Sequence, residues 1–190
     1  GTDDILWFNS QTQQVGFYRM ADTTFTWQDL GLAGANYQIA GTDDFNGDGT
    51  SDILWFNTAT RQTGFYQMDD DTFVWRNLGE AGADYQVAGT GDFNADGTDD
   101  ILWFNAATGQ VGYYAMATNG TFTWQGLGIA GANYEVADIG NYDTDSADDI
   151  LWFNSVTRQV GYYDMNGASF TWQGLGIAGP DFQVAAEEAL

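Results

Sequence analysis

The pentapeptide Ile-Leu-Trp-Phe-Asn occurs four times in this 190-residue chain, beginning at Ile5, Ile53, Ile101 and Ile150. The intervals are 48, 48 and 49 residues, and each repeat also holds one methionine and two tryptophans. A unit of such an array cannot bury its apolar face alone, so neighbouring units must stack. We therefore expect one repeat domain, with repeats at residues 1–36, 37–84, 85–133 and 134–181 and a closing strand at 182–190.

Each repeat predicts four short β-strands, because apolar and aromatic runs alternate with turn-rich segments and helical periodicity is absent. Both faces of the Ile53–Phe56 strand are apolar, as in a sheet that is covered on both sides. Four-stranded sheets repeated every ~40–50 residues are typical of β-propeller blades. In the second repeat the predicted strands are residues 37–42, 52–56, 64–68 and 72–77.

The order of strands within a blade follows from side-chain size. The strand containing Ala40-Gly41 has the smallest residues and fits the crowded axis of a propeller. The strand containing Phe25 and Trp27 has the largest residues and fits the rim. We expect these two strands to form opposite edges of each blade.

The ends of the chain are out of phase with the blades. The first repeat lacks an innermost strand, and Phe182 to Glu187 has the sequence of one. Pairing these parts within the chain closes a four-bladed propeller, which is the arrangement we expect. Pairing between chains gives half of a larger ring or an open strand-exchanged assembly, and this alternative stays open.

The charge balance restricts the partners. There are 27 acidic residues and 4 basic ones, for a net charge of -23. Because no basic stripe can release counterions from phosphates, we expect no nucleic acid partner. The hydrophobic share of 44% indicates a folded chain, and no apolar run approaches the ~18 residues needed for membrane insertion. Divalent cations are the natural partners of such a chain.

Many of the acidic residues lie in loops of the form Asp/Asn-x-Asn/Asp-x-Asp-Gly/Ser-x-x-Asp. A tight loop brings together side-chain oxygens from positions 1, 3, 5 and 9 and a backbone carbonyl from position 7, while glycine at position 6 permits the turn. Hard oxygen donors favour Ca²⁺. The predicted ligands of three Ca²⁺ ions are Asp44, Asn46, Asp48, Thr50 and Asp52; Asp92, Asn94, Asp96, Thr98 and Asp100; and Asn141, Asp143, Asp145, Ala147 and Asp149.

The loops are not identical. Ser146 occupies the glycine position of the third loop, where we expect a strain of about 1 kcal/mol. A remaining loop is split between the termini, with Asp4 at position 9 and Ala189 at position 1, and we predict no metal there. An EF-hand is excluded because position 12 is a tryptophan, for example Trp55, where that motif needs a glutamate. Ordinary solvated hairpin turns are the alternative, and three copies in phase disfavour it.

The segment from Ala88 to Trp103, Ala-Gly-Thr-Gly-Asp-Phe-Asn-Ala-Asp-Gly-Thr-Asp-Asp-Ile-Leu-Trp, resembles the FG-GAP/VCBS repeat of integrin-α-like propellers and many secreted bacterial proteins. The resemblance covers nearly the whole chain. It implies that Asp44, Asn46, Asp48 and Asp52, with their counterparts, are calcium ligands. It also implies adhesion, or binding to carbohydrates or surfaces.

Catalysis is poorly supported, because the chain has no histidine, cysteine or lysine and its carboxylates lie in the predicted metal loops. We expect a secreted, extracellular, non-catalytic module that binds glycans or cell-surface proteins, with calcium serving stability. The N-terminus has no signal-peptide character, so any targeting segment has been removed or lies elsewhere. The alternative function is a structural subunit that self-associates through its terminal strands into a filament, sheath or surface layer.

Three further residue sets recur in phase. The aromatic sets either stack on sugars or pack blade against blade, and both interpretations stay open for Trp27, Trp75, Trp124 and Trp172 and for Tyr18, Tyr66, Tyr114 and Tyr163. We expect Asn9, Asn57, Asn105 and Asn154 to cap hairpin turns. Arg61 and Arg158 occupy the same turn, where we expect them to be solvated.

Overall fold

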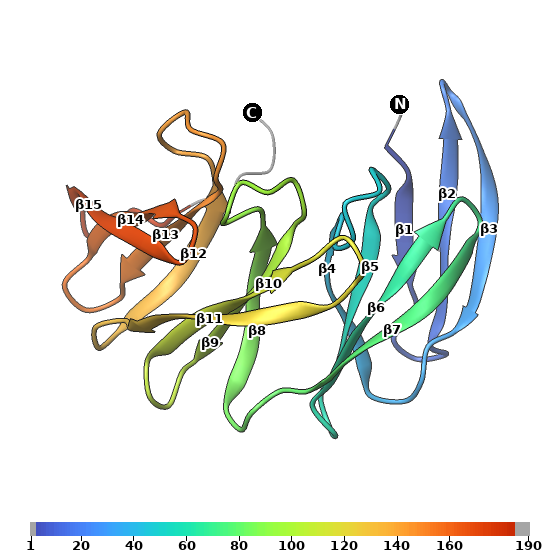
Figure 1. Ribbon diagram of the computed structural model, residues 1–190, viewed down its shortest axis with the longest axis horizontal. Helices are drawn as coiled ribbons and strands as arrows, with labels where there is room; N and C mark the ends of the chain where they lie inside the picture. The colour runs from blue at the N-terminus through green and yellow to red at the C-terminus, as the bar shows by residue number, and fades with distance from the viewer. Residues whose placement is uncertain (1–2, 185–190) are drawn as a thin grey trace. The chain divides into compact units, whose positions relative to one another are not determined.

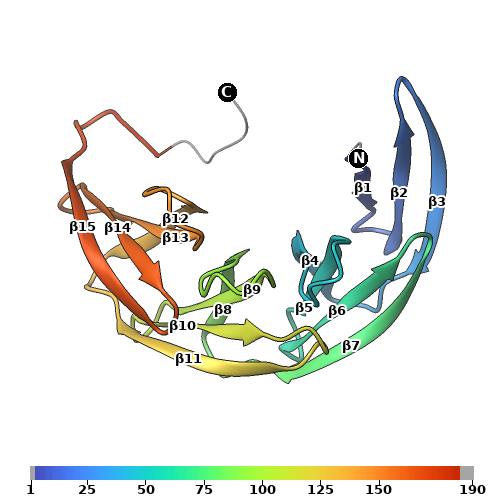
Figure 2. The same cartoon turned by 45° about the horizontal axis from the view of Figure 1, so that its top comes forward.

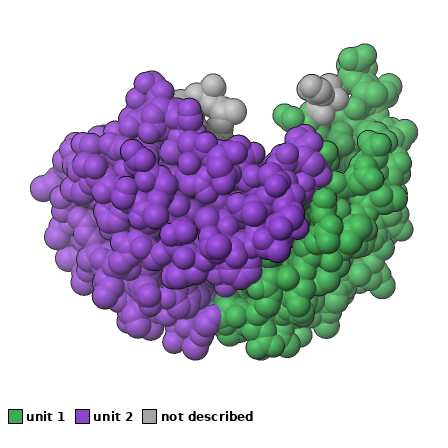
Figure 3. Space-filling view, in the orientation of Figure 1, with its two compact units in different colours: residues 1–42, 50–81 green, residues 43–49, 82–190 purple. Residues whose placement is uncertain are grey.

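The computed structural model describes residues 3–184, and over this range the protein consists of fifteen β-strands without a helix (Figure 1). The strands form four antiparallel sheets, each with its strands in chain order (Figure 2). The chain divides into two compact units, residues 1–42 with 50–81 and residues 43–49 with 82–190 (Figure 3). The predicted all-β class and the repeated antiparallel sheets are confirmed.

The first two sheets follow the first two repeats. The first sheet has three strands, β1 (Ile5–Phe8), β2 (Gln14–Ala21) and β3 (Thr24–Leu32). The second sheet has four, β4 (Tyr37–Asp43), β5 (Asp52–Asn57), β6 (Gln62–Asp69) and β7 (Thr72–Glu80). Each strand of this second sheet contains the strand that the sequence predicts and extends beyond it at one or both ends.

The other two sheets belong to the second unit and have four strands each. The third sheet consists of β8 (Tyr85–Gly91), β9 (Asp100–Asn105), β10 (Gln110–Met116) and β11 (Phe122–Ile129). The fourth consists of β12 (Tyr134–Gly140), β13 (Asp149–Asn154), β14 (Gln159–Asn166) and β15 (Ser169–Ile177). In every four-stranded sheet the small-residue strand and the Phe-x-Trp strand form opposite edges, as their side-chain sizes predict.

The Ile-Leu-Trp-Phe strand lies inside each four-stranded sheet and is buried on both faces. Trp55, Trp103 and Trp152 are each 1% exposed. In the first sheet the same strand, β1, is an edge strand, and its Ile5 and Trp7 are 46% and 51% exposed. Phe8 of the preceding sheet covers Trp55, and among the described residues Trp7 has no such cover from another sheet.

Each unit has its own apolar core, built where one sheet faces the next. In the first unit the ring of Phe8 lies 5.4 Å from that of Trp55, among buried Val15 and Met68. In the second unit Phe104 lies 5.8 Å from the Trp152 ring. The same aromatic contact recurs because the sequence positions recur.

The asparagine that ends the Ile-Leu-Trp-Phe-Asn strand caps the following turn, as predicted. Asn57 Oδ1 accepts hydrogen bonds from the amides of Ala59 (3.0 Å) and Thr60 (2.9 Å), and its Nδ2 donates to the carbonyl of Ala35 (3.1 Å). The turn-capping contacts recur at the other three positions, Asn9, Asn105 and Asn154. The asparagine side chain therefore fixes the hairpin turn. That of Asn57 also holds Ala35, in the connection between β3 and β4.

The predicted solvation of the two turn arginines is wrong. Arg61 Nε donates to the carbonyl of Ala81 (3.2 Å), and Arg158 Nε donates to that of Ala178 (3.2 Å). Each guanidinium also lies over a phenylalanine ring, with that of Arg158 5.4 Å from the centroid of Phe153. These arginines hold the segment that follows the last strand of their sheet, where a backbone carbonyl needs a donor.

A glycine in the next-to-last strand of each sheet lets a tryptophan of the last strand lie close against the sheet. A Cβ added to Gly112 would lie 2.5 Å from both the carbonyl oxygen of Gln125 and Cζ2 of Trp124. Gly16, Gly64 and Gly161 face the same crowding from Trp27, Trp75 and Trp172. The pattern Gly-Phe/Tyr-Tyr therefore records a close approach of the indole to the backbone.

We predict that Gly112→Ala lowers the free energy of unfolding by about 1–3 kcal/mol, because the added methyl group collides with a backbone oxygen that cannot move freely. Gly126→Ala is the matched control, since its Cβ meets only Trp124 Nε1, at 3.5 Å. Urea unfolding followed by circular dichroism measures both variants. Equal stability of the two variants would contradict this account of the glycine.

Candidate metal-binding loops

The aspartate at position 9 of each loop is the first residue of a central strand, and its carboxylate is buried. Asp52, Asp100 and Asp149 are each 0% exposed. Oδ1 of Asp100 accepts the amide of Met116 at 2.9 Å, and the other two contact Met68 and Met165 at the same distance. One oxygen of each carboxylate thus joins the central strand to its neighbour. In loop 141–149 the other oxygen, Asp149 Oδ2, accepts the amide of Tyr142 at 2.9 Å.

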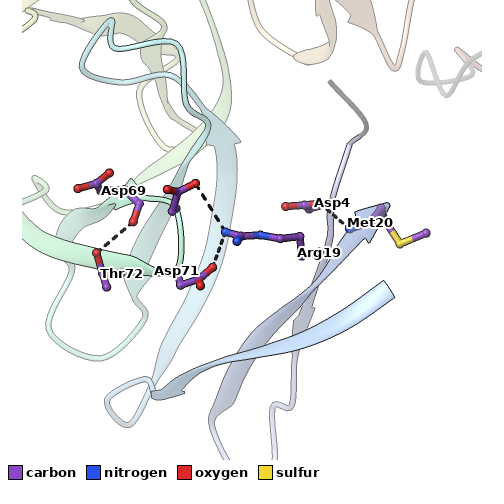
Figure 4. Close-up of polar contacts among 7 residues, drawn as sticks. Asp4, Arg19, Met20, Asp69, Asp71 and Thr72 are labelled. Carbon is purple, nitrogen blue, oxygen red and sulfur yellow. Dashed lines mark hydrogen bonds and ion pairs between the residues drawn. The ribbon is translucent and has the colours of Figure 1, made fainter. Parts of the chain in front are cut away.

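Asp4 in the first sheet makes the same contact, with the amide of Met20 at 2.8 Å (Figure 4). This residue was predicted to be the remnant of a split loop without metal. This hydrogen bond recurs in all four repeats and accounts for an aspartate at residue 4 without the other loop positions. The aspartate at position 9 therefore has a structural role that does not depend on an ion.

In loop 92–100 the side chains at positions 1, 3 and 5 turn toward the loop's own backbone. Asp92 accepts the amides of Asp96 (3.1 Å) and Gly97 (2.8 Å), and Asn94 Oδ1 accepts that of Asp96 (2.9 Å). Two residues with positive φ, Ala95 (57°) and Gly97 (83°), make this turn possible. The predicted ligands thus lie on the inner side of one tight turn, with lone pairs left over for a cation.

Residues 44–49 of loop 44–52 form the same turn. Asp44 accepts the amides of Asp48 (3.1 Å) and Gly49 (2.6 Å), and Gly47 and Gly49 have φ of 70° and 86°. Asn46 is buried at 4% exposure. The predicted ligands Thr50 and Asp52 follow in the first compact unit.

The second carboxylate oxygen of Asp100 is the strongest indication of a ligand. Oδ2 is buried and has no hydrogen bond of standard geometry. Burial, and then the charges of Asp96 and Asp92, raise the pKa of Asp100 to about 8, although the amides of Met116 and Phe93 act in the opposite direction. A buried carboxylate with one oxygen lacking a well-aligned donor is costly unless a cation or proton neutralises it, and oxygen donors alone suit Ca²⁺. The residues of this loop fit a calcium ion.

Loop 141–149 has another backbone path. Its residue with positive φ is Thr144 (77°), at position 4, and the φ of Ser146, at position 6, is not positive. The predicted strain at Ser146 is therefore wrong, because this loop does not need a left-handed residue at position 6. Asn141 accepts the amide of Thr144 (2.8 Å) through Oδ1 and donates to the carbonyl of Asp145 through Nδ2.

A third carboxylate joins this loop from outside it. Asp143, Asp145 and Asp164 each place a carboxylate oxygen within 4.8 Å of the other two. Asp164 lies in β14 and is not among the ligands that the sequence predicts. The equivalent positions in the other sheets are Arg19, Gln67 and Ala115, so the repeat pattern gave no signal. Arg19 instead forms ion pairs with Asp70 and Asp71 (Figure 4).

The aspartate at position 8, also missed, links successive loops. Asp99 Oδ2 accepts the amide of Asp44 (2.9 Å), while the Asp99 amide donates to the Asp44 carbonyl (3.0 Å). Asp148 makes the same two contacts with Asp92, at 3.0 and 2.9 Å. Burial, and then the nearby Asp43, raise the pKa of Asp99 to about 6. The first ligand of one loop is thus held by the next loop along the chain.

Residues 44–103 match the family model described as an FG-GAP-like repeat. This match covers the two loops 44–52 and 92–100 and the sheet between them, and it confirms the resemblance for that part of the chain. No curated protein sequence matches the chain. Among the described residues, no helix is long and apolar enough to cross a membrane.

The raised pKa values predict how the metal-free protein responds to pH. Asp99 and Asp100 bind protons more tightly in the folded state, at pKa values of about 6 and about 8, than in the unfolded state at about 3.9. Between pH 4 and 8 the folded state therefore holds more protons, and the free energy of unfolding falls as pH rises.

In EDTA we predict a higher melting temperature at pH 5 than at pH 8. Asp100→Asn removes one of the titrating groups and should reduce this difference, whereas Asp70→Asn, an exposed residue outside the loops, should leave it as in the parent protein. A melting temperature that rises from pH 5 to pH 8 in EDTA would show that these carboxylates are not strained by burial.

Proposed function

We propose that the FG-GAP-like repeats of this chain form a calcium-stabilised β-propeller module that binds its partner outside the cell and performs no catalysis. The observation that carries the calcium assignment is the buried, unpaired Oδ2 of Asp100, on a loop that turns Asp92, Asn94 and Asp96 inward. Three ions are proposed, one for each of the loops 44–52, 92–100 and 141–149.

The proposed role of calcium is to stabilise the sheets against their own charge. Each ion would neutralise two of the charges that give the chain its net -23. Position 8 ties the first ligand of one loop to the next loop, so an ion in loop 92–100 restrains both the third sheet and, through Asp148, the loop of the fourth. Extracellular calcium-binding modules work at calcium concentrations of ~10⁻³ M. Sites of moderate charge such as these would be filled at that concentration, and we therefore propose a location outside the cell.

The non-catalytic assignment is supported by the chemistry available. The chain contains no histidine, cysteine or lysine, and its most perturbed carboxylate belongs to a proposed calcium loop. Burial and the neighbouring carboxylates account for the raised pKa of Asp100 without a catalytic role.

Calcium titration tests this function. We predict that isothermal calorimetry detects three bound ions, and that a hundredfold excess over Kd stabilises the protein by about 2.7 kcal/mol for each site. Asp96→Asn removes one charge from loop 92–100 and should lower the affinity of one site about tenfold or more, while Asp70→Asn should leave all sites unchanged. Absence of calcium-dependent heat, with equal melting temperatures in calcium and EDTA, would overturn the proposal.

The first sheet is proposed to gain a fourth strand from Phe182 to Glu187. Residues 185–187 of this segment lie outside the described residues, and Phe182 to Val184 are not part of a strand. Two observations support the pairing. The β1 edge exposes Trp7, and Trp7, Tyr18 and Trp27 line an open cavity of about 540 Å³ on the face of the first sheet.

The turn before this segment has the form of the turn before an innermost strand. The amide of Phe182 donates to Gly179 O at 3.1 Å, as the amide of Tyr37, the first residue of β4, donates to Gly34 O at 3.3 Å. Pairing within the chain would close a four-bladed propeller. Pairing between chains would give the second candidate function, a subunit that assembles through its terminal strands, which the same exposed edge favours.

Deletion of residues 182–190 tests the pairing. We predict that the deletion lowers the melting temperature in saturating calcium and leaves a monomer. Light scattering of the intact protein then decides between the two arrangements, since a monomer of 20.8 kDa at all concentrations indicates closure and larger species indicate exchange between chains. An unchanged melting temperature after deletion would contradict both arrangements.

A further inference from the structure

Two pockets of the same composition lie against the second and fourth sheets and share no residue with the calcium loops. The first has a volume of about 220 Å³ and the second about 230 Å³, and each lies within one compact unit. Five aromatic rings line each pocket, beside an alanine and a glycine. They are Tyr37, Trp55, Tyr66, Phe73 and Trp75 in the second sheet, and Tyr134, Trp152, Tyr163, Phe170 and Trp172 in the fourth.

The rings are held at fixed mutual positions. In the second sheet the Trp75 ring lies 5.9 Å from Tyr37 and 5.8 Å from Tyr66, at interplanar angles of 83° and 80°. In the fourth sheet the corresponding distances from Trp172 are both 5.9 Å, with angles of 82° and 80°. Because each tryptophan also lies on a glycine of its sheet, Gly64 or Gly161, the cage is built into the repeat.

The pockets offer few polar groups to a ligand. No charged side chain lines either of them. The hydroxyl of Tyr37 already donates to Gln62 Oε1 at 2.5 Å, and that of Tyr134 to Gln159 Oε1 at 2.6 Å. A sugar ring buried there would leave several hydroxyls without partners, at a cost that disfavours it.

Aromatic faces and a net charge of -23 both favour a cation. A cation whose charge is spread over methyl groups is weakly hydrated and fills an apolar cage, whereas a lysine ammonium is strongly hydrated and resists burial. We infer that these two pockets bind methylated ammonium groups, the chemistry shared by choline and trimethylated lysine. This inference goes beyond the proposed calcium sites, because no residue of the calcium loops lines either pocket.

A titration in saturating calcium tests the inference separately from the calcium sites. Choline chloride is added to ¹⁵N-labelled protein, and the indole N–H resonances are followed by NMR. We expect saturable shifts of Trp75 and Trp172. The neutral isostere 3,3-dimethylbutan-1-ol has the same shape without the charge and should bind at least about tenfold more weakly.

Variants assign the shifts to the two pockets. Trp75→Ala should abolish the response of the second-sheet pocket and leave that of Trp172, and Trp172→Ala should do the reverse. The surviving pocket reports that the protein is still folded. Val74→Ala, at an exposed neighbouring position of β7, is the matched control and should bind choline as the parent does.

Equal affinity for choline and its neutral isostere would overturn the inference, as would no shift with choline. A methyl glycoside that shifts the same indoles more strongly than choline would also overturn it and assign the pockets to sugars. Trimethyllysine serves as the second source of the group. Tighter binding of trimethyllysine than of choline supports a methylated protein partner, and the reverse supports a choline-bearing one.

Discussion

The buried aspartate at the start of each central strand is the residue on which both the sheets and the loops depend. Its Oδ1 accepts the methionine amide of the next strand at 2.9 Å in the three four-stranded sheets, and the exposed Asp4 makes the same contact at 2.8 Å beside the edge strand β1. In the third sheet Oδ2 of the buried aspartate is without a hydrogen bond of standard geometry. A carboxyl group is therefore built into the protein interior, where a proton, or the proposed cation in the loop, has to neutralise it.

The loops form a connected series and not a set of separate sites. Asp99 and Asp148 each hold both the amide and the carbonyl of the first ligand of another loop. Burial, and then the repulsion between these neighbouring carboxylates, raise the pKa values of Asp99 and Asp100. Hydrogen bonds fix the loop geometry, and the ion would remove the repulsion that this geometry creates.

The repeat predicts the sheets well because residues in phase meet the same neighbours. The strands of the second repeat, the capping by Asn57 and the exposed β1 edge all follow from it. Features that differ between repeats could not be predicted in this way. Asp164 has no counterpart, and the backbone of loop 141–149 places positive φ at Thr144 and not at Ser146. The roles of Asp99 and Arg158 escaped because their partners are backbone atoms of distant segments, which carry no sequence signal.

The central claim is that the loops hold calcium through the predicted side chains, and anomalous diffraction from crystals grown in calcium tests it most directly. The account predicts a strong peak within loops 44–52, 92–100 and 141–149, with oxygen ligands at about 2.3–2.6 Å that include Oδ2 of Asp100. A density map in which saturating calcium leaves loop 92–100 without a peak, and Asp100 Oδ2 bound to a protein donor, would contradict it.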